Sequence, residues 1–123
     1  MSSCPCGLGE PYEACCGRYH RGEATAPTAL ALMRSRFTAF ALGETDYLTT
    51  TWHSSTRPAD LELVAGRRWT DLQILGHTGG GLFEATGSVE FRARYRENGR
   101  AGEQQENSRF VREDGQWRYL AGA

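Results

Sequence analysis

The sequence contains no lysine, and all 14 of its basic residues are arginine. We attribute this bias to genomic base composition, although arginine also favours planar, bidentate contacts wherever a carboxylate or phosphate binds. No run of about 20 apolar residues occurs, so a helix that spans a bilayer is excluded. The first residues lack the basic and apolar segments of a signal peptide. The formal net charge of −1 gives no global attraction to nucleic acid or to an anionic membrane. We therefore expect a cytoplasmic protein that binds neither of them.

Aliphatic side chains are scarce in the first 22 residues, which hold all four cysteines of the chain. Such a segment cannot bury a core of its own and needs a covalent or metal staple. The remaining hundred or so residues are enough for one hydrophobic core. We therefore expect two units, a zinc knuckle over residues 1–22 and an α+β domain over residues 23–123.

The cysteines follow a Cys-x-Cys, eight-residue, Cys-Cys pattern, and they are Cys4, Cys6, Cys15 and Cys16. Cytosolic thiols stay reduced, and four thiolates supply the tetrahedral set that zinc prefers. Gly7 and Gly9 allow the chain to fold back tightly after the first pair, and Tyr12 can cover one side of the site. The pattern predicts a structural zinc site with these four ligands.

Other readings of the cysteines are weaker. A disulfide between the adjacent Cys15 and Cys16 would force a strained ring. A catalytic thiol does not explain why four cysteines cluster. His20 is a possible substitute ligand, but a solvent-exposed histidine just past the knuckle is the simpler interpretation.

The segment CPCGLGEPYEACCG, residues 4–17, resembles the SEC-C motif, named for its place at the C-terminus of the SecA translocase. The resemblance implies that the four cysteines are zinc ligands. In the translocase the motif contacts the chaperone SecB and the ribosome, so it also implies a protein partner. Those versions are usually rich in lysine at the middle of the motif, where this chain has Glu10, Pro11 and Glu13.

Helical periodicity follows the knuckle. Leu30, Met33, Phe37 and Phe40 recur at spacings of three and four, which predicts one helix starting at Pro27 and ending at Gly43. A second short helix is expected over residues 44–52. A third is expected over residues 58–66, from a proline that can open a helix to a glycine that can close it.

The period changes to two from Trp69 onward. Apolar and polar residues alternate over residues 85–96, which is typical of a half-buried strand. Asn98-Gly99 and Asp114-Gly115 are hairpin signals, with a strand over residues 103–112 between them and a last strand after them. We expect a curved antiparallel sheet of about four strands with the helices on one face. The expected core aromatics are Phe37, Phe40, Trp52, Phe91, Phe110 and Trp117. Arg92, Arg94 and Arg96 share the opposite face, which we expect to be solvated and paired with Glu90.

The domain also resembles a known family in its motifs RSRFTAF (residues 34–40), DYL (46–48), TWHSSTRP (51–58), VEF (89–91) and ENSRF (106–110). With the knuckle, these are similar to the YchJ-like family of uncharacterised bacterial proteins. The resemblance implies a nuclear-transport-factor-2-like (NTF2-like) fold, a cone of helices over a curved sheet, and implies no established activity.

Polar residues on the expected inner face can form a site. Glu106 and Ser108 share a face with Phe110 and would point toward the helices, where Arg36 and His53 are available partners. These four can line a small-molecule pocket, and His53 with Asp46 or Glu106 can serve general acid–base chemistry. The alternative is a buried polar network that only fixes helix–sheet register.

A cytosolic zinc-binding adaptor is the function that this pattern favours. Four protein ligands leave no open position for metal catalysis, and no phosphate-binding or nucleophile motif occurs in the sequence. In this interpretation the knuckle contacts a protein partner, and the cone supplies a second surface or a pocket. A small metal-independent lyase, isomerase or hydrolase with its site in the cone is the alternative.

Overall fold

The computed structural model of the chain describes residues 3–122 and places the helices before a sheet of four strands. This confirms the expected α+β class and element order. The elements are η1 (Tyr12–Ala14), α1 (Cys16–His20), α2 (Ala29–Leu42), α3 (Thr45–Thr50), β1 (Arg67–Gly79), β2 (Thr86–Glu97), β3 (Arg100–Glu113) and β4 (Gln116–Gly122). No helix in the described residues is long and apolar enough to cross a membrane.

Helix α2 is the central element between the knuckle and the sheet. It begins two residues after Pro27, because Thr28 acts as N-cap and its Oγ1 accepts a hydrogen bond from Ala31 N at 3.1 Å. It ends at Gly43, whose φ of 79° is the left-handed C-cap conformation expected from the sequence. Buried residues lie on two faces of this helix, since it is covered from two directions.

The prediction of a helix over residues 58–66 is wrong. This segment is irregular, and its half-buried Leu61 and Leu63 alternate with the exposed Glu62 and Val64. A period of two gives a helix no apolar stripe to bury, and stability in short helices comes mostly from such a stripe. The segment instead runs as an extended loop from α3 to β1.

The sheet is an antiparallel meander in the order β1-β2-β3-β4. Both predicted hairpin turns are confirmed. Asn98 and Gly99 have φ of 51° and 83°, and Asp114 and Gly115 have φ of 54° and 80°. Positive φ at both central residues defines the turn whose twist matches a hairpin, and Asn-Gly and Asp-Gly adopt it readily.

Strand β1 contains two irregularities that sequence alternation does not reveal. Its register with β2 shifts between Trp69 and Asp71 and again between Ile74 and Gly76. Each bulge changes the face to which the following residues point. Trp69, Leu72 and Ile74 therefore all pack against the core, although the first two are three residues apart.

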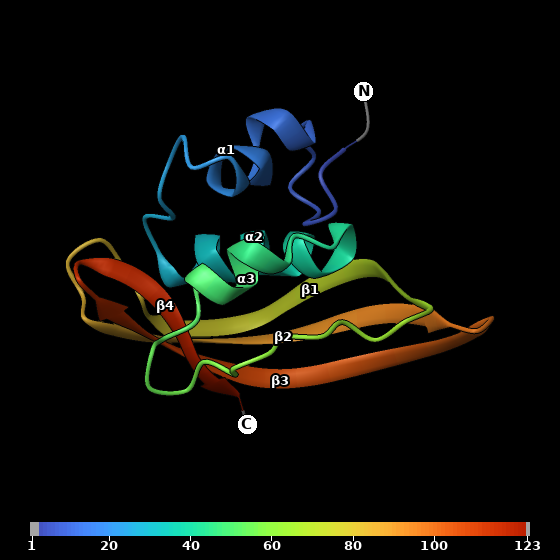
Figure 1. Ribbon diagram of the computed structural model, residues 1–123. Coiled ribbons are helices and arrows are strands. Elements are labelled where there is room, and N and C mark those ends of the chain that lie inside the picture. Colours follow the sequence, from blue (N-terminus) through green and yellow to red (C-terminus); the bar gives the residue numbers. More distant parts are fainter. Residues whose placement is uncertain (1–2, 123) are drawn as a thin grey trace.

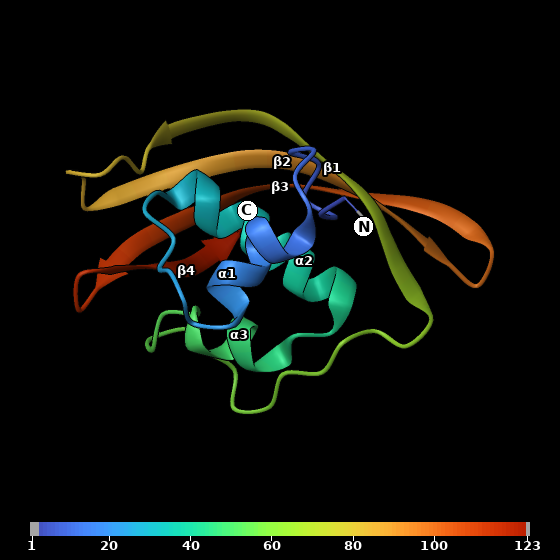
Figure 2. The same ribbon diagram turned by 90° about the horizontal axis from the view of Figure 1, so that it is seen from above.

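The three helices lie on one face of the curved sheet, with the knuckle stacked outside α2 (Figures 1 and 2). Four of the six predicted core aromatics are buried, namely Phe37, Phe91, Phe110 and Trp117. Phe40 and Trp52 are only half-buried, because both line a cavity between the helices and the sheet.

The outer face of the sheet is polar, as expected, but its ion pairs differ from the prediction. Arg92 Nε lies 3.0 Å from Glu103 Oε2 on β3, and Arg94 Nη1 lies 3.8 Å from Asp71 Oδ2 on β1. Glu90 forms an ion pair with neither arginine. Asp71 lies directly opposite Arg94, whereas Arg92 lies opposite Gln105 and reaches Glu103 diagonally.

Candidate functional site

The knuckle is a turn followed by two short helical segments. Cys4 N donates to Glu10 O at 2.7 Å and closes the turn, inside which Gly7 and Gly9 have φ of 88° and 86°. These left-handed conformations bring the second cysteine pair back to the first without a side-chain clash. η1 and α1 then present Cys15 and Cys16 toward the turn.

The four cysteines come together as the sequence predicts. All are buried, and their Sγ atoms lie within 4.8 Å of one another. The Sγ atoms of Cys6 and Cys15 are 3.6 Å apart. Tetrahedral zinc with Zn–S bonds of about 2.3 Å needs sulfurs about 3.8 Å apart, so this donor set fits a four-thiolate metal ion. No disulfide joins these four cysteines.

The local electrostatics favour a thiolate at the centre of the cluster. The Cys16 thiol, together with Leu8 N–H and the other cysteines, hydrogen-bonds Cys6 and lowers the pKa of Cys6 to about 5, against burial, which raises it. Burial raises the pKa of Cys15 to about 11. A thiolate is the form of cysteine that binds metal.

His20 is not solvent-exposed, which corrects the sequence interpretation, and both of its ring nitrogens contact protein groups. It is half-buried, and its Nε2 lies 2.9 Å from Ser35 O, an acceptor that requires Nε2 to carry the proton. Its Nδ1 therefore accepts from Tyr12 O–H at 2.7 Å. Tyr12 in turn packs against the cysteines, as predicted. His20 thus ties the cover of the cysteine cluster to helix α2.

Two further contacts join the knuckle to α2. Arg34 Nη1 donates to Cys6 O at 2.9 Å. The hydroxyl of Thr38 lies 3.6 Å from Cys4 Sγ. The knuckle is therefore packed against helix α2 of the cone and is not held by its linker alone.

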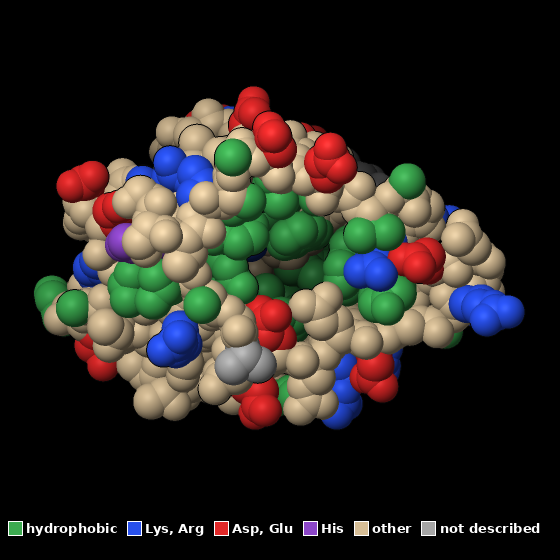
Figure 3. Space-filling model, turned by 60° about the horizontal axis from the view of Figure 1, so that its bottom comes forward, with side chains coloured by type: hydrophobic (Ala, Val, Ile, Leu, Met, Phe, Trp, Pro, Cys, Tyr) green, Lys and Arg blue, Asp and Glu red, His purple; other side chains and the backbone are tan. Residues whose placement is uncertain are grey.

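A cavity of about 580 Å³ lies on the other side of α2, between the helices and the sheet. Figure 3 shows apolar side chains gathered around its opening. The walls come from α2, the loop before β1, and the inner faces of the four strands. Its aromatic residues are Phe37, Phe40, Trp52, Trp69, Phe91 and Tyr119. Arg36, Glu106 and Ser108, three of the predicted pocket residues, also line it.

Arg36 is a buried cation at one end of this cavity. Its side chain is 3% exposed, and its Nη1 donates to Leu48 O at 2.8 Å and to Thr51 Oγ1 at 2.7 Å. The guanidinium stacks over Trp52 and Tyr119, with 5.0 and 4.7 Å to the ring centroids. Burial lowers the pKa of Arg36 to about 10, so the group is still charged at neutral pH.

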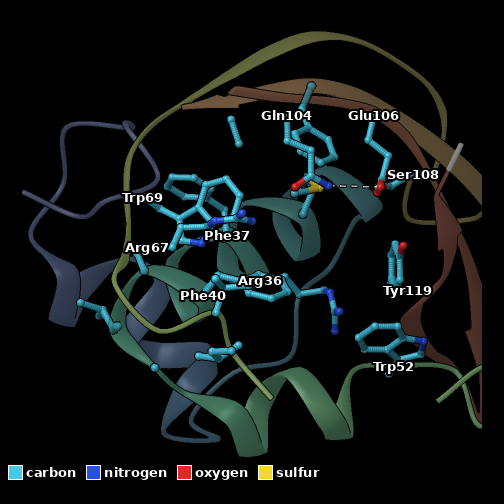
Figure 4. A pocket seen from close by; sticks show the side chains of 18 of the residues that line it. Arg36, Phe37, Phe40, Trp52, Arg67, Trp69, Gln104, Glu106, Ser108 and Tyr119 are labelled. Carbon is cyan, nitrogen blue, oxygen red and sulfur yellow. Dashed lines mark hydrogen bonds between the residues drawn. The ribbon is translucent and has the colours of Figure 1, made fainter. Parts of the chain in front are cut away.

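Glu106 faces the same end of the cavity from β3 (Figure 4). Its Oε2 accepts from Ser108 Oγ at 2.7 Å, and its Oε1 lies 3.4 Å from Gln104 Nε2. Burial, with the nearby negative charge of Glu106, raises the pKa of Tyr119. Arg36 and Glu106 therefore share the cavity, but they lie farther apart than the 4.0 Å of an ion pair.

His53 and Asp46 lie elsewhere. His53 belongs to the short segment 51–53, which pairs with β4. Its Nδ1 lies 2.7 Å from Ser55 Oγ. Its Nε2 lies 3.8 Å from Glu113 Oε2, so its acidic neighbour is Glu113 and not Glu106. Asp46 is exposed on α3, beside a separate groove. The structure therefore brings together Arg36, Glu106 and Ser108, and separates His53 and Asp46 from them.

Sequence reasoning missed most of the aromatic wall and Tyr119 as site residues. Trp69 shares the inner face with Leu72 and Ile74 only because a bulge separates it from them. Tyr119 is two residues from the buried Trp117 on β4, and this alternation could have placed it on the inner face.

Comparison with known proteins gives consistent matches along the chain. Residues 28–122 match the family described as "YchJ, middle NTF2-like domain". A UPF0225 protein of Streptomyces coelicolor is 56% identical over 119 residues, which cover 97% of this chain and 93% of that protein. A UPF0225 protein of Corynebacterium glutamicum is 51% identical, with 97% and 94% covered.

Two solved structures share the whole architecture. The solution structure of a SEC-C motif containing protein from Rhodopseudomonas palustris superposes with a TM-score of 0.88 at 31% identity, covering 99% of this chain and 98% of that one. The crystal structure of a SEC-C motif containing protein from Psychrobacter arcticus gives a TM-score of 0.80 at 27% identity, with 98% and 81% covered.

Proposed function

The chain belongs to the YchJ-like family of UPF0225 proteins, and we propose that it is a cytosolic zinc-binding adaptor whose knuckle contacts a protein partner. The observation that carries the zinc proposal is the set of four buried sulfurs at tetrahedral spacing. Four thiolates favour zinc over the harder divalent cations. Because all four ligands come from the protein, the ion has a structural role and no open position for substrate.

The adaptor role follows from what the metal would hold in place. Leu8 is 55% exposed at the tip of the knuckle, between the two glycines of its turn. The acidic side chains of Glu10 and Glu13 are exposed nearby in the sequence. A metal that fixes this turn presents an apolar anchor with an acidic surround before any partner arrives, which lowers the entropy cost of docking. The matching partner surface is an apolar pocket with a basic rim.

The enzymatic alternative receives less support. General acid–base catalysis needs its groups within hydrogen-bond reach of one substrate. His53, the predicted base, pairs with Ser55 and Glu113 at the surface, and Asp46 lies on a different groove.

Metal content is measured on protein that has never been exposed to a chelator. Elemental analysis should find about one zinc per chain, and replacement by Co²⁺ should give the charge-transfer absorption of a tetrahedral thiolate site. Cys15→Ser should lower metal retention. A different stoichiometric metal, or much less than one equivalent, would show that the zinc proposal is wrong.

The partner contact is tested by affinity capture with two matched surface variants. Leu8→Asp places a charge on the proposed anchor, whereas Leu82→Asp places the same charge on an equally exposed leucine of the β1–β2 loop. One protein should be captured by the unmodified chain and by the Leu82 variant, and lost with Leu8→Asp and Cys15→Ser. Equal capture by all four would contradict the adaptor role.

A further inference from the structure

The cavity beside α2 has two unlike ends. Figure 4 shows Trp69, Phe37 and Phe40 on one side and Arg36, Glu106 and Tyr119 toward the other. Arg67 lies beside Trp69, and its charge is paired with Glu97 at 2.8 Å. The cavity volume of about 580 Å³ lies within the range of about 300–1,000 Å³ typical of cavities that hold small organic ligands. An apolar chamber with a few converging polar groups is the usual form of such a site.

The donor at the polar end is Arg36. Only its Nη1 is used by the protein among the described residues, while its other nitrogens have no partner there. No carboxylate oxygen of the described chain lies within 4.0 Å of this guanidinium. A buried cation without a counter-ion carries a desolvation cost that a new hydrogen-bond acceptor reduces.

The acceptor at the same end is Glu106. Ser108 Oγ and Gln104 Nε2 occupy one site on each of its oxygens, and the Tyr119 hydroxyl is a third neighbouring donor; a carboxylate offers about four acceptor sites in all. Glu106 is half-buried on the inner face of β3. The polar end therefore holds one positive and one negative group across a gap, with no net charge and with spare capacity on both.

We propose that this cavity binds an uncharged aromatic molecule with an acceptor and a donor side by side on one edge, as in a lactam or a carboxamide. The carbonyl accepts from Arg36, the N–H donates to Glu106, and the ring lies against the aromatic wall. A carboxylate would be repelled by Glu106 and an ammonium by Arg36. A purely apolar molecule would displace water from both groups and leave them unpaired. The inference does not depend on the metal or on a protein partner.

Four bicyclic probes of similar size test this class. They are carbostyril, a lactam; naphthalene, without a polar group; naphthoate, an anion; and naphthylmethylammonium, a cation. Calorimetry with the full-length, metal-loaded protein should rank carbostyril first, about tenfold tighter than naphthalene. NMR shift changes should fall on the residues at the polar end and on the aromatic wall. No binding, a different first-ranked probe, or shift changes outside the cavity would overturn the proposal.

Glu106→Gln supplies a second, internal test. It keeps the side-chain shape and removes the negative charge, so the polar end becomes net positive. Naphthoate should then gain at least about tenfold in affinity relative to carbostyril. Glu103→Gln is the matched control, because it removes the same charge from the exposed outer face of the same strand. An unchanged ranking in Glu106→Gln, or the same change in Glu103→Gln, would contradict the proposal. The ranking with the unmodified protein stands as a test even if the variant fails to fold.

Discussion

Arg34 and Arg36 are two residues apart on α2 and serve opposite sides of the helix. Arg34 donates to Cys6 O in the knuckle, whereas Arg36 donates to Leu48 O and lines the cavity. Residues two apart on a helix point in nearly opposite directions, so one helix can form a wall of both sites. The knuckle and the cavity are thus separate sites with one common support.

The Arg34 contact predicts a kinetic effect on the metal. Arg34→Met removes the hydrogen bond to Cys6 O and leaves the four thiols unchanged, so zinc should pass to a chelator several-fold faster, at a stability cost of about 1 kcal/mol. The measurement is the rate of zinc transfer to a chromophoric chelator. Arg109→Met, on the exposed outer face of β3, is the control and should release zinc at the original rate. Equal rates for both variants would refute the supporting role of Arg34.

Truncation of two phenylalanines should distinguish the core from the cavity wall. Phe110 is fully buried against Tyr119 and the rest of the core, so Phe110→Ala should cost about 3–5 kcal/mol in the free energy of unfolding. Phe40 has one side on the cavity, so Phe40→Ala should cost less than about 2 kcal/mol. Urea unfolding measures both values, and equal costs would mean that the cavity is not open in solution.

Glu113 makes stability depend on acid pH. The Ser54 hydroxyl and backbone amide donate hydrogen bonds to its carboxylate, and these bonds, with a smaller electrostatic contribution from His53, lower its pKa below the ordinary value of 4.5. Since the folded pKa is the lower one, this stabilisation is present above the unfolded pKa and is lost as the pH falls through the folded pKa. Unfolding curves of the unmodified protein and of Glu113→Gln should therefore differ at neutral pH and converge in acid. A constant difference across this range would exclude the mechanism.

Tyr47 makes stability depend on alkaline pH. Burial raises its pKa from 10.0 to about 12, and its hydroxyl lies 2.7 Å from Ser35 Oγ. The unfolded phenol ionises first, so stability should fall as the pH rises from the ordinary pKa toward the folded one. Because the pKa values of Tyr12 and Tyr119 are raised as well, the measurement is the amplitude of the late phase in phenolate absorbance, which Tyr47→Phe should reduce by one tyrosine. An unchanged late amplitude in this variant would contradict the assignment.

Sequence patterns predicted most of the secondary structure, because local chemistry decides it at those positions. The left-handed turns at Asn98-Gly99 and Asp114-Gly115 and the C-cap at Gly43 need particular residues, and those residues are there. The helix over residues 58–66 failed for the converse reason. A proline and a glycine at its ends are compatible with a helix, but its apolar residues alternate with a period of two, so an extended loop partly buries Leu61 and Leu63 where a helix could not bury both on one face.

The cysteine cluster was predictable and the cavity only partly so. Four ligands of one type within 13 residues are a local signal. The cavity instead depends on strand phase, which the bulges of β1 alter, and on the length of the loop between α3 and β1. Alternation therefore located Glu106 and Ser108 on the regular strand β3. His53 was predicted to lie with them, but its actual neighbour is Glu113 at the β3–β4 hairpin.

The meander has a consequence for the order of folding. Each strand pairs with its neighbour in the chain, so the sheet forms through short loops, whereas the Trp117 Nε1 to Pro27 O hydrogen bond closes a separation of 90 residues. We expect the helical layer to settle only after β4 is in place. The cysteines precede α2 and all four strands in the chain, so we expect the contacts between the knuckle and α2 to reach their final form late. Until then the thiols should be accessible to oxidants and to competing metals.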